Sequence, residues 1–530
     1  MTLKVSHSGP VSEAVERFVP ELVKDQVASR LFAKDFALWG KEAEAESAIR
    51  LGWVDAAKNS LTLVPELKQL RAKLLEQGLT RVVLCGMGGS SLAPEVITKT
   101  FGCDLVVLDS TDPSQVRAGL EGDLSKTIVV VSSKSGSTIE TDSQKRSFEA
   151  AFKAVGIDAT KRIFIVTDPD SPMHKKAIAD GFRVFLADPT VGGRYSGLTA
   201  FGVVPTLLAG VDTEAILRNA VSASEGLARD DETNPGLIIG AAIARTASSR
   251  GFKDKLGFVP AGSSIVGFGD WVEQLIAEST GKLGRGVLPV VLERNSNEIQ
   301  AAHDDMLLIG LADDAGESSF DLAVSGDLGE MMLIWEVATA VASRLLGVNP
   351  FDQPDVESAK IAARALLGSP GDGIEDSSSS PDMGFASLGF ELNSSEISEC
   401  LAQLFRFAQP DSYLSIHCYL NRELFAKAEL LRELVARATS RPTTFGWGPR
   451  FLHSTGQYHK GGPNQGVFLQ IVSGEADDLV IPGREFGYRQ LIDSQASGDA
   501  KVLAKGGSKV LVVRLSNPET GISQLIGALS

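Results

Sequence analysis

The segment Arg81–Pro94 reads RVVLCGMGGSSLAP, a short apolar run that ends in glycines and serines ahead of a second apolar stretch. A buried strand followed by a glycine loop and a helix is the first half of a βαβ unit. Glycine lets a ligand approach the backbone, and the first amide groups of the following helix face that ligand. The segment therefore predicts a parallel α/β fold with a binding loop after its first strand.

The same pattern continues on both sides of this loop. Strands that alternate with helices imply parallel sheets joined by right-handed crossovers. The predicted strands of the first block are 81–85, 105–108, 127–131, 162–167 and 183–186. A second block repeats the plan with strands at 256–260, 287–292 and 305–311 and helices near 213–250, 269–280 and 328–346. We predict two tandem three-layer α/β/α units.

The length of 530 residues favours more than one domain, because a single core rarely organises so long a chain. Helical spacing of apolar residues predicts an N-terminal helical region, and a serine- and glycine-rich stretch around 368–381 predicts a linker. A further α/β pattern follows, with strands at 413–419, 466–472 and 509–515. The predicted boundaries are 1–75 for the helical region, 76–212 and 213–366 for the two units, 367–384 for the linker and 385–530 for a C-terminal extension.

The third predicted strand runs into VSSKSGSTIET at 131–141, a loop dense in hydroxyl groups ahead of a helix. Hydroxyl groups and helix amides can bind a phosphate without a large positive charge. A capped serine-rich loop with no ligand is the structural alternative. A P-loop is excluded because GxxxxGK[ST] does not occur, and the GxGGSS spacing argues against a dinucleotide site.

Composition limits the partners. The 51 basic and 67 acidic residues give a net charge of −16, which disfavours nucleic acid. An apolar run long enough to span a membrane and a signal-peptide core are both missing, so we expect a cytoplasmic protein. Four scattered cysteines and six scattered histidines lack any metal-ligand spacing, so we expect neither a metal nor another cofactor.

Five motifs resemble the glucose-6-phosphate isomerase family. They are GMGGSSLAP at 86–94, SSKSGSTIET at 132–141, GGRYS at 192–196, EQLIAESTGK at 273–282 and NPFDQPDVESAK at 349–360. The chain departs from the family pattern at Thr280, where asparagine is usual, and at Asp355, where glycine is usual. GPRFLHSTGQYHKGG at 448–462 is similar to the isomerase half of fused transaldolase–isomerase proteins.

The resemblance implies two sugar-isomerase domains and reversible isomerisation of glucose 6-phosphate and fructose 6-phosphate in glycolysis and gluconeogenesis. It assigns the proton-transferring base to Glu278 and stabilisation of the enediolate to Arg194. Lys360 is placed near the ring oxygen. The residues implied to bind substrate are Gly88, Gly89, Ser90, Ser133, Lys134, Ser135, Thr138 and Gln353.

The histidine that opens the sugar ring is the least defined part of this assignment. The family's GTNGQH segment is not recognisable between Glu278 and Gln353, where only His303 occurs. Two histidines lie in the glycine-rich segment of the extension, which we expect to fold back onto the active site of its own or a partner subunit. We choose His459, with His453 and then His303 as alternatives.

Two other functions remain open at this point. A non-catalytic regulator that binds sugar phosphates could keep the serine loop but would not need Glu278 and Lys360. An isomerase that also accepts mannose 6-phosphate would need the same residues, because the sequence does not locate the contacts that recognise C2. The expected partner is a sugar-phosphate substrate, and a homodimer is left open.

Overall fold

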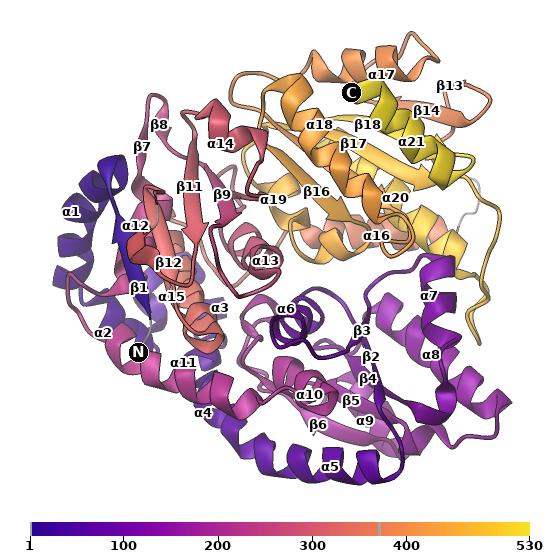
Figure 1. The fold of residues 1–530 in the computed structure, drawn as a ribbon, viewed down its shortest axis with the longest axis horizontal. Helices are drawn as coiled ribbons and strands as arrows, with labels where there is room; N and C mark the ends of the chain where they lie inside the picture. Colours follow the sequence, from indigo (N-terminus) through magenta and orange to yellow (C-terminus); the bar gives the residue numbers. More distant parts are fainter. Residues whose placement is uncertain (1–2, 318, 369–372) are drawn as a thin grey trace.

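The computed structural model describes residues 3–317, 319–368 and 373–530. The described chain builds three α/β units around three large sheets, and the short strands β7 (Ala247–Ser248) and β8 (Gly251–Phe252) form a hairpin. In Figure 1 the second unit lies to the left, the first unit at the lower right, and the C-terminal unit above it. The predicted α/β class with parallel sheets is confirmed.

The first sheet is fully parallel, with the order β3-β2-β4-β5-β6. Its strands are β2 (Arg81–Gly86), β3 (Val106–Leu108), β4 (Thr127–Ser132), β5 (Ile163–Thr167) and β6 (Arg183–Leu186). Because successive side chains of a strand point to opposite faces, Val82 and Leu84 enter one core while Val83 and Cys85 enter another. One face packs on α5 (Val64–Glu76), α6 (Leu92–Thr100) and α10 (Ala200–Ala209), and the other on α7 (Pro113–Leu120), α8 (Ile139–Ala154) and α9 (Pro172–Ala179).

The chain order of this sheet determines where a ligand can bind. From β2 the chain crosses to β3 on one side, and then returns to β4 on the other side. Such a reversal opens a crevice beyond the carboxyl ends of the two strands. The glycine loop that follows β2 and the serine loop that follows β4 therefore lie side by side at this crevice.

The second sheet has the order β1-β12-β11-β9-β10 and is parallel except for β1. Its strands are β1 (Lys4–His7), β9 (Lys255–Pro260), β10 (Leu288–Val291), β11 (Met306–Leu311) and β12 (Leu322–Ser325). Its main helices are α1 (Gly9–Lys24), α11 (Thr213–Leu227), α12 (Pro235–Arg245), α13 (Phe268–Thr280) and α15 (Leu328–Leu346). The prediction that the N-terminal region is helical misses β1, which pairs with β12. The helical stretch expected near 213–250 consists of two helices, α11 and α12, with a break before Pro235.

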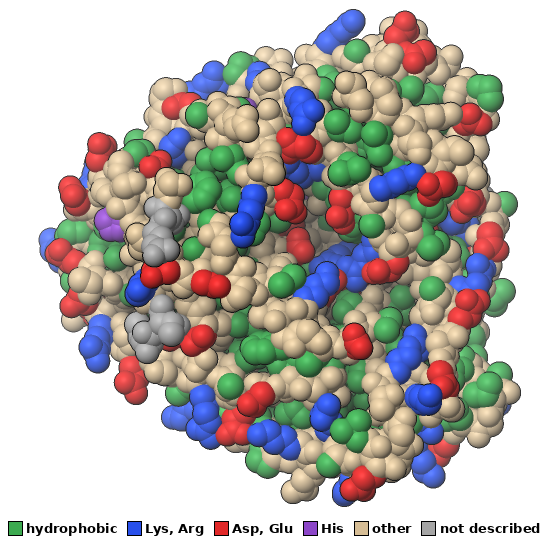
Figure 2. Space-filling model, viewed as in Figure 1, with side chains coloured by type: hydrophobic (Ala, Val, Ile, Leu, Met, Phe, Trp, Pro, Cys, Tyr) green, Lys and Arg blue, Asp and Glu red, His purple; other side chains and the backbone are tan. Residues whose placement is uncertain are grey.

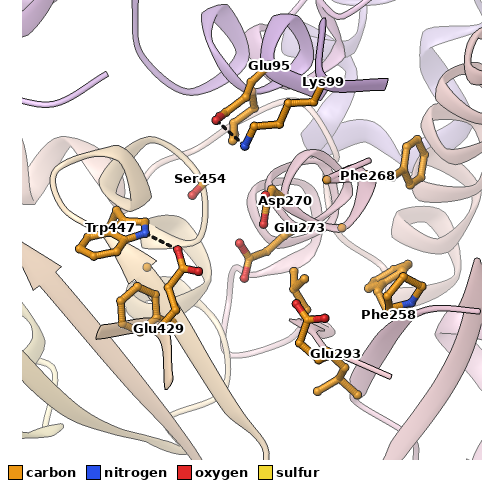
Figure 3. A pocket seen from close by; sticks show the side chains of 18 of the residues that line it. Glu95, Lys99, Phe258, Phe268, Asp270, Glu273, Glu293, Glu429, Trp447 and Ser454 are labelled. Atoms are coloured by element: carbon orange, nitrogen blue, oxygen red, sulfur yellow. Dashed lines mark hydrogen bonds and ion pairs between the residues drawn. The ribbon is translucent and has the colours of Figure 1, made fainter. Parts of the chain in front are cut away.

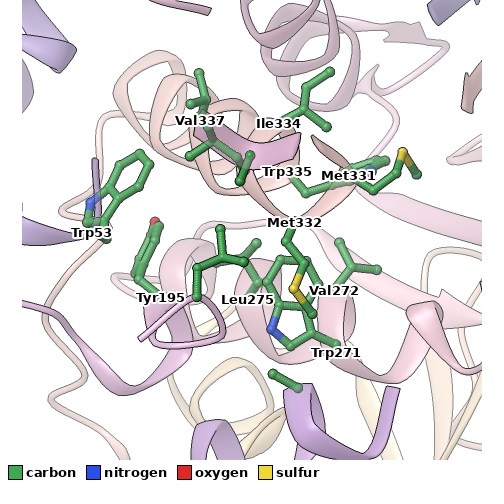
Figure 4. Packing of buried hydrophobic residues seen from close by; sticks show 14 of the residues in the cluster. Trp53, Tyr195, Trp271, Val272, Leu275, Met331, Met332, Ile334, Trp335 and Val337 are labelled. Carbon is green, nitrogen blue, oxygen red and sulfur yellow. The ribbon is translucent and has the colours of Figure 1, made fainter. Parts of the chain in front are cut away.

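Helix α15 is apolar on almost every side, which is the pattern of a helix buried all round. Met332 lies against α13, where Trp271 and Leu275 face it (Figure 4), and Trp335 packs edge-on against the phenylalanine ring of β9. All four side chains are buried. Truncating such a tryptophan to alanine costs about 3–5 kcal/mol, so this core holds α13 firmly in place.

The C-terminal sheet has the order β13-β14-β18-β17-β15-β16, with β13 and β14 antiparallel to their neighbours. Its strands are β13 (Ser378–Ser379), β14 (Met383–Leu388), β15 (Tyr413–Tyr419), β16 (Thr443–Trp447), β17 (Gly466–Ser473) and β18 (Lys509–Leu515). One face packs on α17 (Ile397–Phe405), α18 (Leu430–Thr439) and α21 (Pro518–Leu529), and the other on α20 (Tyr488–Lys505).

The predicted linker at 367–384 is corrected by this sheet. Residues 369–372 of that stretch lie outside the described residues, but its later part supplies β13 and the start of β14. The helix α16 (Val356–Leu367), which precedes it, packs closely on α20, since a Cβ added at Gly498 would lie 2.9 Å from the backbone nitrogen of Ala363. The end of the predicted second unit therefore packs against the C-terminal unit.

The remaining helices are short connections. The α-helices are α2 (Val27–Phe32), α3 (Glu44–Ser47), α4 (Ala56–Ser60), α14 (Asn297–Ala301) and α19 (Gly456–Gly461). The 3-10 helices that bear on the site are η5 (Gly88–Ser90), η8 (Gly193–Tyr195), η10 (Ala426–Glu429) and η11 (Arg450–His453). The 3-10 helix η11 and the α-helix α19 follow each other in one segment between β16 and β17.

Candidate active site

The glycine loop after β2 packs tightly against two other segments. Gly88 has a φ of +55°, a conformation that side chains other than glycine rarely adopt. A Cβ there would lie 2.5 Å from the carbonyl oxygen of His453, and a Cβ at Gly89 would lie 2.0 Å from that of Gly193. Ser90 follows them and is buried. The two glycines therefore allow η8 and η11 to meet at the end of β2.

The serine loop after β4 leads into the N-terminus of α8. Thr138 is the N-cap residue, and the hydroxyl group of Ser133 donates to its Oγ1 over 3.2 Å. Ser135 is exposed and its hydroxyl lies 3.1 Å from that of Ser137. Hydroxyl groups beside a helix N-terminus form a site that favours an anion.

Lys134 extends from the same loop but is already paired with an acid. Its Nζ lies 2.5 Å from Oδ2 of Asp168. Burial lowers the pKa of the Lys134 ammonium group, although Asp168 opposes this change. An anion bound at this loop would thus meet a lysine whose charge is largely balanced by its carboxylate partner.

Glu278 lies on α13 with its carboxylate buried opposite a guanidinium group. Nε of Arg194 is 3.2 Å from Oε2 of Glu278, and the side chains are 3% and 7% exposed. Burial raises the pKa of Glu278, and Arg194 opposes that rise. A carboxylate with a raised pKa is a stronger base than an exposed glutamate, which suits proton abstraction.

Arg194 is fixed by its surroundings. Its Nη2 donates to the side chain of Gln353 over 2.9 Å, and the guanidinium group also contacts the backbone oxygens of residues 350–352. Tyr195 stacks on Trp53 with ring centroids 5.0 Å apart and holds η8 in the core (Figure 4). Lys282 stabilises the loop at 349–353, which contacts Arg194, by donating to the backbone oxygens of Asn349 and Asp352. The guanidinium is therefore held in one orientation, with its positive charge beside Glu278.

Lys360 approaches the site from α16. Its side chain is 39% exposed, and its Nζ lies 3.7 Å from Glu357. The positive charge of Lys360 lowers the pKa of both Glu278 and Glu140. The charge of the lysine therefore acts on both buried carboxylates.

The structure places His453, and not His459, beside Glu140 and Gln274. Nε2 of His453 lies 3.0 Å from Oε1 of Glu140, and its charge lowers the pKa of Glu278. Gln274, one turn before Glu278, donates to the carbonyl oxygen of His453 over 2.7 Å. The extension thus does fold back onto the core, and within a single chain.

His459 instead faces the C-terminal sheet. Its Nδ1 lies 2.9 Å from the hydroxyl group of Tyr413, and its ring packs against His417 and Phe468. Burial lowers its pKa well below the usual value. His303 lies at a third place, where burial lowers the pKa of its ring and the nearby Asp305 and Glu298 oppose that change. The sequence alone does not separate His453 from His459, because they share one segment and only the packing of η11 and α19 decides which ring faces the core.

Glu140 is a site residue that sequence analysis missed. It lies in the first turn of α8, directly after the serine loop, and is 4% exposed. Gln495 of α20 also donates to its Oε1, over 2.7 Å. Burial raises the pKa of Glu140, but the facing His453, a backbone hydrogen bond and the charge of Lys360 together lower it overall. The feature of the sequence that could have pointed to it is its position, two residues after Thr138 at the end of the serine loop.

A separate cleft of about 500 Å³ opens on the face shown in Figure 2, where α6, α13 and β16 meet near the centre of Figure 1. Asp270 and Glu273 point into it from the first half of α13, with Glu429 and Trp447 opposite (Figure 3). Glu278 lies further along α13, beyond the residues that line this cleft.

In the described part of the chain, no group of three or more His, Cys, Asp or Glu side chains could hold a metal ion. Likewise, no described helix is long and apolar enough to cross a membrane.

Two parallel α/β units that enclose a hydroxyl-rich loop and a buried carboxylate define the class of sugar-phosphate isomerases. Solved structures support the fold: a hypothetical protein from Thermus thermophilus aligns with a TM-score of 0.59 at 26% identity, over 69% of this chain and 100% of that one. A glucose-6-phosphate isomerase from Chlamydia trachomatis aligns with a TM-score of 0.55 at 18% identity, over 70% of this chain and 89% of that one.

Sequence comparison identifies the family. The model of phosphoglucose isomerase matches residues 73–290. A probable glucose-6-phosphate isomerase of Natronomonas pharaonis is 30% identical over 339 residues, which cover 54% of this chain and 79% of that protein. One from Haloarcula marismortui is 28% identical over 340 residues, covering 54% and 78%. The chain belongs to the phosphoglucose isomerase family. The resemblance of 448–462 to fused transaldolase–isomerase proteins stays a prediction.

Proposed function

We propose that this protein interconverts glucose 6-phosphate and fructose 6-phosphate, with Glu278 as the base that moves the proton between C2 and C1. Relatives that carry the name of this activity, and the match to the family, support the substrate pair. The observation that carries the proposal is the pairing of buried Glu278 with Arg194 at 3.2 Å, next to a loop suited to a phosphate. Such a site provides a base, a fixed positive charge and an anion-binding loop together.

Substrate binding would use the two loops of the first sheet. The phosphate would contact the hydroxyl groups of Ser133, Ser135 and Thr138 and the amide groups at the start of α8. Gly88, Gly89 and Ser90 would line the sugar on the side of β2. The local dipole and hydroxyl donors make binding of an anion favourable even though the whole chain carries a charge of −16.

Ring opening would come first, because only the open aldehyde can lose its C2 proton to form an enediol. It requires a proton to be taken from the hydroxyl group at C1 and another to be given to the ring oxygen. His453, held by Glu140, and Lys360 are the two groups that approach Glu278 from the C-terminal side. We assign these proton transfers to them, and this assignment replaces His459.

Proton transfer between the two carbons would follow. The carboxylate of Glu278 takes the proton from C2, the electron pair of that bond forms the C1–C2 double bond, and the C1 carbonyl pair moves onto O1 to give the enediolate. O1 then gains a proton, the C2 hydroxyl loses one to become the ketone, and Glu278, whose proton exchanges with water while the enediolate exists, gives a proton back to C1. Arg194 would stabilise the negative charge on the oxygen while the enediolate exists. Carbon is neither gained nor lost, and no external oxidant is needed.

A coupled assay of the purified protein tests this proposal. We expect conversion of glucose 6-phosphate to fructose 6-phosphate and the reverse reaction, with little turnover of glucosamine 6-phosphate. Equal turnover of mannose 6-phosphate would establish the wider specificity that the sequence left open. Binding of sugar phosphates without turnover of any of them would instead support a regulator. The cytoplasmic location and a homodimer stay predictions.

A further inference from the structure

Three separate elements bring the proposed catalytic groups together. Glu278 comes from α13, Lys360 from α16, and His453 from η11, which leads into α19. The three groups must be held to within a fraction of an ångström for proton transfer to be efficient. A side chain that joins all three elements would therefore control catalysis without touching the substrate.

Gln457 is such a side chain. From α19 its Nε2 donates to the carbonyl oxygen of Gly281 over 2.9 Å and to Oδ2 of Asp355 over 2.6 Å. Its Oε1 accepts from the backbone amide of Asp355 over 3.0 Å. The side chain is fully buried. Both amide protons and the oxygen are thus used in three bonds to two other elements.

Each bond ends close to a proposed catalytic residue. Gly281 is the C-cap of α13 and follows Glu278 by three residues. Asp355 is the N-cap of α16 and precedes Lys360 by five residues. Gln457 itself follows His453 by four residues. The amide therefore connects the end of one helix, the start of another and the segment that supplies the histidine.

The packing around Gln457 leaves little freedom for these elements to shift. A Cβ at Gly281 would lie 2.5 Å from Cα of Tyr458, and the amide of Gly284 donates to the carbonyl oxygen of Gly461 over 2.9 Å. On the side of α20, Lys460 pairs with buried Asp499 over 2.6 Å. Helix α19 is thus fixed to the C-terminal unit and to the end of α13 at the same time.

We propose that Gln457 is a positioning residue, which sets Glu278 and Lys360 against His453 through Gly281 and Asp355. The inference rests on the proposed function. Asp355 stands where the family pattern has glycine, and its carboxylate is the acceptor that allows the amide of Gln457 to reach α16. The C-terminal unit therefore controls the geometry of the site in addition to supplying a histidine.

The test compares Gln457→Ala with Gln470→Ala. Both replace a buried glutamine of the C-terminal unit, but Nε2 of Gln470 donates within that unit, to the carbonyl oxygen of Ala496 over 3.1 Å. We expect Gln457→Ala to lower kcat by about 10- to 100-fold, the range for displacement of reacting groups by up to 1 Å, with KM changed by less than about 3-fold. Gln470→Ala should keep the kcat of the wild type.

A swapped pair separates positioning from a general loss of stability. Gln457→Glu places a carboxylate directly against the carboxylate of Asp355, so the two charges repel. This variant should lower kcat at least as much as Gln457→Ala. Adding Asp355→Asn supplies an amide donor that faces the introduced carboxylate at position 457. The double variant should recover about 10-fold of the lost kcat. If Gln457→Ala does not fold, Asp355→Ala, at a partly exposed helix start, should lower kcat by about 10-fold.

Three results would overturn the inference: equal kcat values for Gln457→Ala and Gln470→Ala, no recovery in the swapped pair, or an Asp355→Ala enzyme with the kcat of the wild type. Failure of the proposed function is a different result. In that case the wild type itself would show no isomerisation, or Glu278→Gln would remain active.

Discussion

Replacing His453 with alanine should slow the turnover of ring-closed glucose 6-phosphate by about 100-fold. A positioned acid–base group contributes about 10²- to 10⁴-fold, which corresponds to about 3–5 kcal/mol of barrier. We expect the low end because Lys360 remains, and its charge reaches both Glu278 and Glu140. Turnover of an analogue that is locked in the open-chain form should fall by less than about 5-fold, since the Glu278 step is left intact.

The matched control is His459→Ala, which removes a histidine six residues further along the same segment. Its ring contacts Tyr413 in the C-terminal unit, so the variant should lose stability but keep most of the kcat of the folded enzyme. Both variants would be measured in the coupled assay and with the open-chain analogue. The reasoning is refuted if His453→Ala turns over glucose 6-phosphate within about 3-fold of the wild type, or if both substrates slow equally.

Two further predictions concern the loop that follows β4. Replacing Ser133 and Thr138 with alanine should weaken binding of a sugar phosphate by about 10-fold or more while binding of the unphosphorylated sugar changes little, as titration calorimetry can show; equal weakening would remove the loop from the phosphate site. Glu140→Gln should lower the free energy of unfolding by about 2 kcal/mol above pH 5, since the hydrogen bonds from His453 and Gln495 then reach a neutral amide oxygen in place of a charged carboxylate. Because the folded pKa of Glu140 is lowered, this difference should shrink as the pH falls below about 4.5 in urea titrations, and a difference that grows in acid would contradict it.

Much of the fold could be predicted from local patterns. The strands β2, β4 and β15 are apolar runs bounded by turn residues, and their predicted limits agree with the structure to within one residue. The strand β1 was missed because its four residues are partly exposed and gain their structure from pairing with β12. The strand β14 was missed because MGFASL contains no β-branched residue and follows a serine-rich stretch.

The candidate site was predictable where a motif lies at the end of a strand. The serine loop and the glycine loop meet because β2 and β4 are neighbours in a parallel sheet. Glu278 lies on α13 and was predicted from its resemblance to the family motif. The histidine could not be chosen in this way, because the orientation of His453 depends on contacts of η11 with Gly88 and Gln274, both far away in sequence. Glu140 was missed for the same reason, since its partner His453 lies in another unit.

The most direct test of the proposed function is isotope exchange by the Glu278→Gln enzyme. The isosteric amide keeps the shape of the side chain but cannot take a proton from C2. Fructose 6-phosphate would be incubated in deuterated water with the wild type and with the variant, and deuterium on carbon would be followed by NMR. We predict rapid incorporation by the wild type and a rate at least about 100-fold lower for Glu278→Gln, with substrate binding retained. Exchange by the variant at a rate within a few-fold of the wild type would contradict the assignment of Glu278 as the base.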